Sequence, residues 1–164
     1  MTKELGNRII YIINHFRYEG VTRMTEQNDI MQQLERMKGE VDYSVKLPDA
    51  EMDIMLAVWE LEPPVTTSAL MEKIGKRRGW KAPTLISFLA RLENRGFLLS
   101  YKNGKERYYL PAADRSLYVN QITRRFVDTC HGGSFVRMLD ALFADREFGD
   151  SDIDELLIWL KNRK

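Results

Sequence analysis

Basic side chains concentrate in one stretch of this 164-residue chain. Residues 73–110 contain ten lysines and arginines against two glutamates, a net charge of +8. Residues 46–72 carry −5, and residues 1–45 and 111–164 carry −1 each, so the whole chain has a net charge of only +1. Positive charge concentrated in this way favours a polyanionic partner, which charge alone does not assign to DNA, RNA or a membrane surface.

Part of this basic stretch has the spacing of a helix over residues 83–95. Pro83 suits its first turn, because the missing N–H costs little there, and Gly96 suits its C-terminus. A buried stripe at every third or fourth residue is expected from Leu85, Phe88, Leu89 and Leu92. The opposite face then carries Thr84, Ser87, Arg91 and Asn94, with Ile86 and Ala90 at its edge.

The residue types on this face suit contact with nucleic acid. Thr84 and Ser87 are short enough to reach base edges, and Ile86 can contact a thymine methyl group. Arg91 and Arg95 lie further along the helix and suit phosphates. Each has a structural alternative, because Ile86 can be buried against a neighbouring element and arginines are common on solvated helix faces.

A β-hairpin is predicted after this helix. The strand-like runs 97–102 and 105–110 flank Asn103-Gly104, a strong hairpin signal, and we expect a type I′ turn with positive φ at both residues. Basic and amide side chains surround the tip at Lys102, Asn103, Lys105 and Arg107, and Lys81 precedes the helix. Charged edge strands also prevent aggregation, but this hairpin directly follows a basic helix, which favours DNA contact.

Two more helices are predicted upstream. Asp49 can cap a helix whose apolar stripe is Met52, Met55, Leu56 and Trp59, and Pro63-Pro64 ends it. Thr66 can cap a second helix carrying Ala69, Leu70 and Ile74. Three helices and a hairpin predict a winged helix-turn-helix domain over residues 46–111, in which residues 83–95 enter the major groove. The fold class is mainly α with a small β-hairpin wing.

The C-terminal part, residues 112–164, is predicted to form three amphipathic helices. They break at Gly132-Gly133 and at Gly149, and Asp150 or Ser151 can cap the last one. About fifty residues in short helices can hardly bury their apolar faces alone, so we expect two chains to bury them mutually. The predicted dimerisation residues are Phe126, Phe135, Leu139, Leu142, Phe143, Ile153, Leu156, Leu157 and Leu160.

Residues 1–45 form an N-terminal extension. Leu5, Ile9, Ile12, Ile13 and Phe16 predict a short amphipathic helix, and Met31, Leu34 and Met37 a weaker one. The extension is either a surface arm or an added dimer or partner contact, unless translation starts later, for example at Met24. Its apolar run is too short to span a membrane, so we expect a cytoplasmic protein.

Catalytic and metal-binding signals are weak. Cys130 is the single cysteine, which excludes an intramolecular disulfide and a cysteine metal cluster. His131 follows it directly, and sequence neighbours seldom form a nucleophile–base pair. We expect no enzyme activity, no metal site and no cofactor.

Residues 47–164 resemble the penicillinase/methicillin repressor family, which includes copper-responsive repressors. The matching segments are 47–55 with Trp59, Trp80 with Thr84, 91–98, 102–105, 108–111, Gly132-Gly133 and 152–156. The resemblance implies a homodimer of winged helices with a helical C-terminal dimerisation domain that represses transcription from palindromic operators. It also implies an upstream sensor-protease that cleaves the dimerisation domain.

Three departures from the family pattern affect these expectations. The Ser-Pro-Lys-Thr run of many members is Lys81-Ala82-Pro83-Thr84 here, and Ile86 replaces an Arg or Gln, so we expect a different operator. The Asn-Phe bond that is cut in β-lactam-responsive repressors corresponds to Leu142-Phe143, which argues against induction by that route. The C-terminal cysteine cluster of copper-responsive members is missing, which argues against copper sensing.

The sequence thus favours a homodimeric repressor that binds double-stranded operator DNA. Two other classes stay open. A winged helix can serve as a protein-interaction module, which a lack of salt-sensitive DNA binding would favour. The chain can also be an RNA-binding factor, which a preference for RNA over duplex DNA would reveal.

Overall fold

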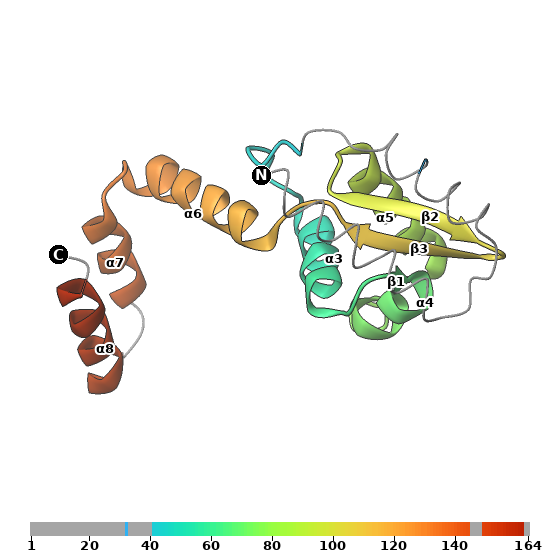
Figure 1. Cartoon of the computed structure of the whole chain (residues 1–164). Helices are drawn as coiled ribbons and strands as arrows, with labels where there is room; N and C mark the ends of the chain where they lie inside the picture. Colours follow the sequence, from blue (N-terminus) through green and yellow to red (C-terminus); the bar gives the residue numbers. More distant parts are fainter. Residues whose placement is uncertain (1–31, 33–40, 145–148, 163–164) are drawn as a thin grey trace. The chain divides into compact units, whose positions relative to one another are not determined.

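The computed structural model describes residues 32, 41–144 and 149–162. Its elements are α3 (Asp49–Glu60), β1 (Val65–Thr66), α4 (Thr67–Leu70), the π-helical turn η1 (Met71–Gly75), α5 (Ala82–Asn94), β2 (Leu98–Asn103), β3 (Glu106–Pro111), α6 (Arg115–His131), α7 (Phe135–Phe143) and α8 (Asp150–Lys161) (Figure 1). The chain divides into two compact units, and the boundary lies between Val119 and Asn120, inside α6. The helices predicted within residues 1–45 lie outside the described residues.

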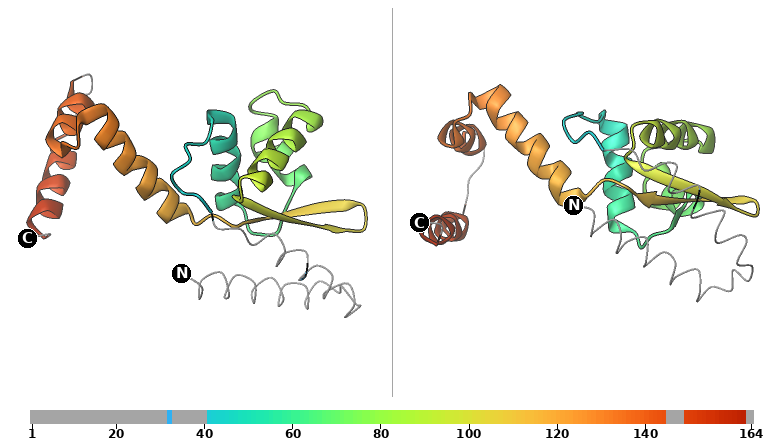
Figure 2. Two further views of the ribbon diagram at one scale, coloured as in Figure 1. Left: turned by 90° about the horizontal axis from the view of Figure 1, so that it is seen from above. Right: turned by 45° about the horizontal axis from the view of Figure 1, so that its top comes forward.

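The first unit is a winged helix, as predicted. Its antiparallel sheet has the strand order β1-β3-β2. Helices α3 and α5 lie over the same face of this sheet, and the tip of the β2–β3 hairpin projects beyond them (Figure 2). The core between the helices and the sheet includes fully buried Ile54, Leu70, Leu89 and Leu98.

Helix α5 follows its predicted pattern closely. Pro83 lies in the first turn, and Gly96, with φ of 75°, takes the left-handed conformation that ends the helix. Leu85, Leu89 and Leu92 are fully buried. The prediction that Phe88 belongs to the buried stripe is wrong. This residue is only half-buried, because its ring packs against the half-buried ring of Trp80.

The buried face of α3 differs from the prediction by one residue. The helix buries Glu51, Ile54, Met55 and Val58, while the predicted Met52, Leu56 and Trp59 are half-buried. The first position of this i, i+3, i+4, i+7 stripe is the acidic Glu51, so the pattern of apolar residues in the sequence did not indicate it. Asp49 is the first helical residue, and no side chain caps the helix.

Thr66 caps α4 as predicted, because its Oγ1 accepts a hydrogen bond from the backbone N–H of Ala69 at 3.1 Å. The short strand β1 was not predicted. Val65 and Thr66 pair with Tyr109 and Tyr108 of β3 and thereby add a third strand to the hairpin. Two residues are too few for a periodicity signal, so only their long-range partner defines them as a strand.

The hairpin forms where it was predicted, but the expected type I′ turn is wrong. Asn103 pairs with Glu106 as the last residue of β2, which leaves Gly104 and Lys105 in the turn. Among the described residues, positive φ occurs only at glycines, and Gly104 has φ of 61°. A positive φ at the first turn residue alone is typical of a type II′ turn. This register places Tyr101 opposite Tyr108, and their rings stack 5.3 Å apart.

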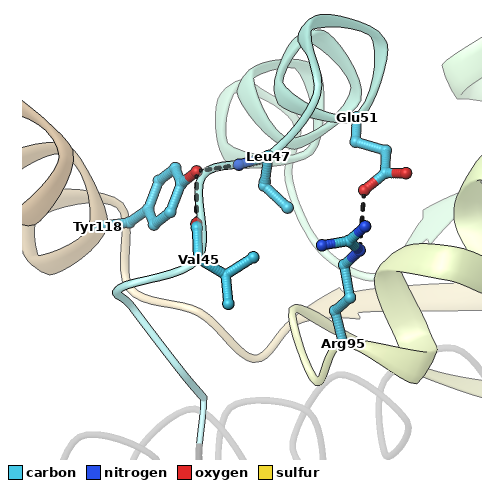
Figure 3. A network of polar contacts seen from close by, with 5 residues as sticks. All are labelled: Val45, Leu47, Glu51, Arg95 and Tyr118. Atoms are coloured by element: carbon cyan, nitrogen blue, oxygen red, sulfur yellow. Dashed lines mark hydrogen bonds and ion pairs between the residues drawn. The ribbon is translucent and has the colours of Figure 1, made fainter.

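The segment before α3 is joined to the start of α6. The Tyr118 hydroxyl accepts a hydrogen bond from Leu47 N at 2.9 Å and donates one to Val45 O at 3.2 Å (Figure 3). The Tyr43 hydroxyl accepts one from Asp114 N at 3.0 Å. These contacts make the end of the N-terminal extension, from Tyr43 onward, part of the winged-helix unit.

The second unit contains the rest of α6 together with α7 and α8. Ser134 caps α7 by accepting a hydrogen bond from Arg137 N. The predicted cap of α8 by Asp150 or Ser151 is wrong, because Gly149 is the N-cap and its N–H donates to Asp152 Oδ2 at 3.2 Å. No helix among the described residues combines the length and apolar character needed to cross a bilayer.

Candidate nucleic-acid interface

The outward face of α5 carries the side chains that the sequence assigned to it. Thr84, Ile86, Ser87, Ala90, Arg91 and Asn94 are all exposed. Ile86 is 50% exposed, so it is not buried against a neighbouring element of the chain. Because Leu85, Leu89 and Leu92 hold the opposite face in the core, the helix cannot rotate to hide this surface without exposing them.

The guanidinium group of Arg91 lies over the aromatic ring of Phe88. Its guanidinium carbon lies 5.5 Å from the centre of the Phe88 ring, within the range of a cation–π interaction. Phe88 in turn packs on Trp80, with ring centres 5.2 Å apart. This packing restricts the arginine to the surface that it shares with the hydroxyl side chains of α5. Trp80 packs on Phe88 and Tyr108 stacks on Tyr101, so both rings are engaged within the fold.

Ion pairs within the fold occupy half of the basic residues between 73 and 110. Four of these residues pair with the acidic stretch 46–72, through Lys73–Glu60 at 3.2 Å, Lys76–Glu72, Arg78–Asp53 and Arg95–Glu51 at 3.3 Å. A fifth, Arg107, pairs with Glu93 at 3.5 Å. The +8 of this stretch therefore overstates the charge that is free to attract a partner.

The other five basic residues form no ion pair with any described residue. They are Arg77, Lys81, Arg91, Lys102 and Lys105, and all five are exposed. They lie in the turn before α5, at its N-terminal end, on its outward face and on the hairpin. Arg77 was not among the predicted contacts, because a sequence does not show which cations of a basic run are already paired.

Arg95 is engaged with a buried carboxylate. Its Nε lies 3.3 Å from Glu51 Oε2, and Glu51 is only 1% exposed (Figure 3). That oxygen has no hydrogen-bond partner in the described part of the chain, so Arg95 is what compensates its charge. The pair joins the C-terminal end of α5 to the first turn of α3.

The wing also contains a paired arginine. Arg107 Nη1 donates a hydrogen bond to Ser100 Oγ at 2.7 Å, and the Ser100 hydroxyl donates to Glu93 Oε1. Lys102 and Lys105 are exposed near the tip, and Asn103 ends β2. Glu93 and Ser100 were not predicted to contribute to this region, because nothing in their local sequence indicates a contact between helix and wing.

Two buried tyrosines have shifted acidities. Burial raises the pKa of Tyr109 above its ordinary value of 10.0, against a smaller lowering effect of its hydrogen bond with Thr67. Burial likewise raises the pKa of Tyr118, against the smaller effect of its hydrogen bond with Leu47 N. Both hydroxyls therefore stay protonated at neutral pH and act as hydrogen-bonding groups of the scaffold.

The second unit keeps most of its apolar side chains exposed. Of the predicted dimerisation residues, seven are exposed, namely Phe126, Phe135, Leu142, Phe143, Ile153, Leu157 and Leu160, and Leu139 and Leu156 are half-buried. Val136, Ile158 and Trp159 are exposed as well and were not predicted. Exposed apolar area of this extent usually marks an interaction surface.

Cys130 is exposed, and the ring of His131 packs on Phe126 with centres 5.1 Å apart. Within the described ranges, no three His, Cys, Asp or Glu side chains are grouped closely enough to hold a metal ion.

Comparison with known proteins identifies relatives over most of the chain. The family model of the penicillinase repressor matches residues 47–162. A penicillinase repressor of Bacillus licheniformis is 26% identical over 122 residues, which cover 73% of this chain and 94% of that protein. The methicillin resistance regulatory protein MecI of Mammaliicoccus sciuri is 21% identical over 111 residues, which cover 68% of this chain and 89% of that protein.

Two solved structures match part of the chain. The DNA-binding domain of the repressor BlaI is 29% identical, with a TM-score of 0.41 over 44% of this chain and 88% of that chain. The monomeric form of Bacillus licheniformis BlaI in complex with the blaP half-operator is 26% identical, with a TM-score of 0.40 over 48% and 92%.

The family model begins at Leu47, two residues before α3, and ends at Asn162, just after α8. It therefore includes the winged helix and the helical C-terminal unit, and leaves out the N-terminal extension. The chain belongs to the penicillinase repressor family and is a DNA-binding transcriptional repressor rather than an enzyme.

Proposed function

We propose that this repressor binds a palindromic operator in the cytoplasm as a homodimer, with α5 in the major groove and the β2–β3 hairpin along the DNA backbone. The observation that carries the proposal is the common surface of α5 and the wing. There, exposed hydroxyl groups lie among basic side chains that no carboxylate of the described chain neutralises. A protein-docking surface has no need of this charge.

Base recognition falls to the N-terminal half of α5. Thr84 and Ser87 offer hydroxyl groups that both donate and accept hydrogen bonds, and Ile86 offers an exposed apolar surface for a thymine methyl group. Such contacts discriminate between bases, so substitutions at these positions change which sequence is bound.

Phosphate contacts fall to the unpaired cations. Lys81 and Arg91 flank the base-reading residues along α5, and Lys102 and Lys105 contact the DNA backbone from the wing. Each phosphate neutralised by such a cation makes the logarithm of the binding constant fall by about 0.9 per tenfold increase in salt. Substitution of one cation should therefore weaken binding to every sequence and flatten that slope by about one unit.

Dimerisation falls to the second unit. Its exposed apolar side chains suit burial against a second copy of the chain, which converts binding of the second half-site into an intramolecular event. Cleavage within this unit by an upstream sensor-protease, which the family resemblance implied, would relieve repression by separating the two winged helices.

The operator is tested by selecting bound duplexes from a random DNA pool at several salt concentrations. We expect a palindrome with half-sites about one helical turn, roughly 34 Å, apart. Failure to enrich any sequence, together with weak binding, would overturn the proposal. Preferred binding of RNA or complete loss of salt dependence would replace it with an RNA-binding or protein-docking function.

The dimer is tested by replacing Leu139 and Leu142 with Asp and measuring the mass in solution by sedimentation. We expect a folded monomer that binds DNA weakly, since burial of carboxylates in an apolar interface is costly. Ala141→Asp is the control for added negative charge, because it adds one carboxylate to α7 at an exposed position outside the predicted stripe. A double variant that stays dimeric would contradict this interface.

A further inference from the structure

We propose that Arg107 is a positioning residue, which fixes the wing against the recognition helix α5 through Ser100 and Glu93 instead of contacting phosphate. The proposal rests on the proposed function, because it concerns how the wing is presented to DNA. It separates Arg107 from the exposed lysines on the same hairpin, with which sequence position alone would group it.

Three elements meet in this contact. Arg107 lies on β3, Ser100 on β2 and Glu93 on α5. Arg107 Nη1 donates to Ser100 Oγ at 2.7 Å and lies 3.5 Å from Glu93 Oε1. The Ser100 hydroxyl donates onward to the same Glu93 oxygen. The serine therefore accepts from the cation and donates to the anion, which orients all three groups.

The burial of the side chains shows that Glu93 depends on this contact more than Arg107 does. The side chain of Glu93 is 15% exposed and Ser100 as a residue is 3% exposed, while the Arg107 side chain remains 50% exposed. A carboxylate withdrawn from water is stabilised only by donors and cations close to it. Turning Arg107 toward a phosphate would leave Glu93 with the serine hydroxyl alone, so the guanidinium is committed to the fold.

Strand register supports the same assignment. Lys102 is the direct cross-strand partner of Arg107, and like charges in that arrangement repel. Ser100 lies two residues before Lys102 and hence on the same face of β2. The diagonal contact toward Ser100 and Glu93 draws the guanidinium away from Lys102, which leaves that lysine exposed for a partner.

The test is a double-mutant cycle in the full-length protein. Operator affinity is measured against salt concentration for Arg107→Ala, Glu93→Ala and the double variant. A positioning role predicts that each single variant binds about tenfold more weakly and that the double variant binds no more weakly than either. It also predicts an unchanged salt slope, whereas Lys105→Ala should flatten the slope by about 0.9.

Glu106→Gln is the matched charge control. It also removes a negative charge from the hairpin, but Glu106 contacts Tyr108 and not the Arg107 cluster. If charge alone mattered, Glu93→Ala and Glu106→Gln would both bind DNA as well as or better than the wild type. That result, or a salt slope flattened by about one unit in Arg107→Ala, would overturn the positioning role.

A second measurement needs no DNA. Amide hydrogen exchange of residues 100–108 should rise in Arg107→Ala and in Glu93→Ala and stay unchanged in Lys105→Ala, because only the first two release the wing from α5. Unchanged exchange in all variants would overturn the inference. Wild-type protein that binds no duplex would instead overturn the proposed function, and the exchange data would still decide the role of Arg107.

Discussion

Replacing Arg95 with alanine removes the cation that compensates a carboxylate buried in the core of the winged helix. Glu51 is 1% exposed, and its Oε2 lies 3.3 Å from Arg95 Nε. Loss of one partner of a buried ion pair costs about 3–5 kcal/mol. The Arg95 side chain is 39% exposed, which places this pair near the lower limit, and we expect a loss of about 2–3 kcal/mol.

Thermal denaturation followed by circular dichroism measures this loss. For a winged helix of this size, each kcal/mol shifts the midpoint by about 4–8 °C, so Arg95→Ala should melt about 10–20 °C below the wild type. The control is Glu51→Met combined with Arg95→Met, which replaces both charges by apolar side chains and should recover most of the stability.

The outcome also decides the role of Arg95 on DNA. A midpoint shift of only a degree or two would mean that the pair behaves like an exposed salt bridge, which would refute the burial argument. A double-methionine variant as unstable as Arg95→Ala would refute it as well. If the stable double variant shows a salt slope flattened by about one unit, Arg95 contacts phosphate in the complex.

Three further predictions follow from the same structure. Burial raises the pKa of Tyr118 and Tyr109 above 10.0, so the folded protein keeps protons that the unfolded chain releases, and stability is lost as the pH rises above about 10. In alkaline titrations followed by circular dichroism, Tyr118→Phe should lose stability less steeply, and a slope equal to the wild type would contradict this linkage. At neutral pH the same variant leaves the buried Leu47 N–H without its acceptor, which should lower the free energy of unfolding by about 1–3 kcal/mol in urea denaturation. Gly104→Ala should lower the free energy of unfolding by about 1–2 kcal/mol. This cost comes from the φ of 61° alone, because an added Cβ there meets no atom within 4 Å. An unchanged free energy of unfolding would indicate a different turn conformation.

Sequence periodicity and terminal signals predicted helix α5 and the Thr66 cap of α4 correctly, whereas the caps expected at Asp49 and at Asp150 or Ser151 were wrong. The α5 stripe of Leu85, Leu89 and Leu92, the Thr66 cap and the Gly96 terminus all depend on residues within one or two helical turns. Local backbone geometry decides such features, so they can be recognised in a single sequence. The outward residues of α5 follow directly, since a helix with a buried face has a defined exposed face.

Features that depend on distant partners were missed or wrong. The face of α3 was displaced by one residue because Glu51 is buried against Arg95, 44 positions away in the chain. Strand β1 exists only through its pairing with β3, and the stacking of Tyr101 on Tyr108 accompanies a hairpin register with Gly104 and Lys105 in the turn.

The basic residues between 73 and 110 show the same division between what the sequence determines and what the tertiary structure decides. The sequence by itself determined that ten basic residues lie between 73 and 110, some before the predicted helix over residues 83–95 and the others on that helix and on the hairpin. Only the tertiary structure decided that half of them, including Arg95 and Arg107, already face carboxylates, and that Arg77, Lys81, Arg91, Lys102 and Lys105 form no ion pair with any described residue. The physical reason is that an ion pair depends on the distance between two charges in space, which periodicity along one segment does not specify.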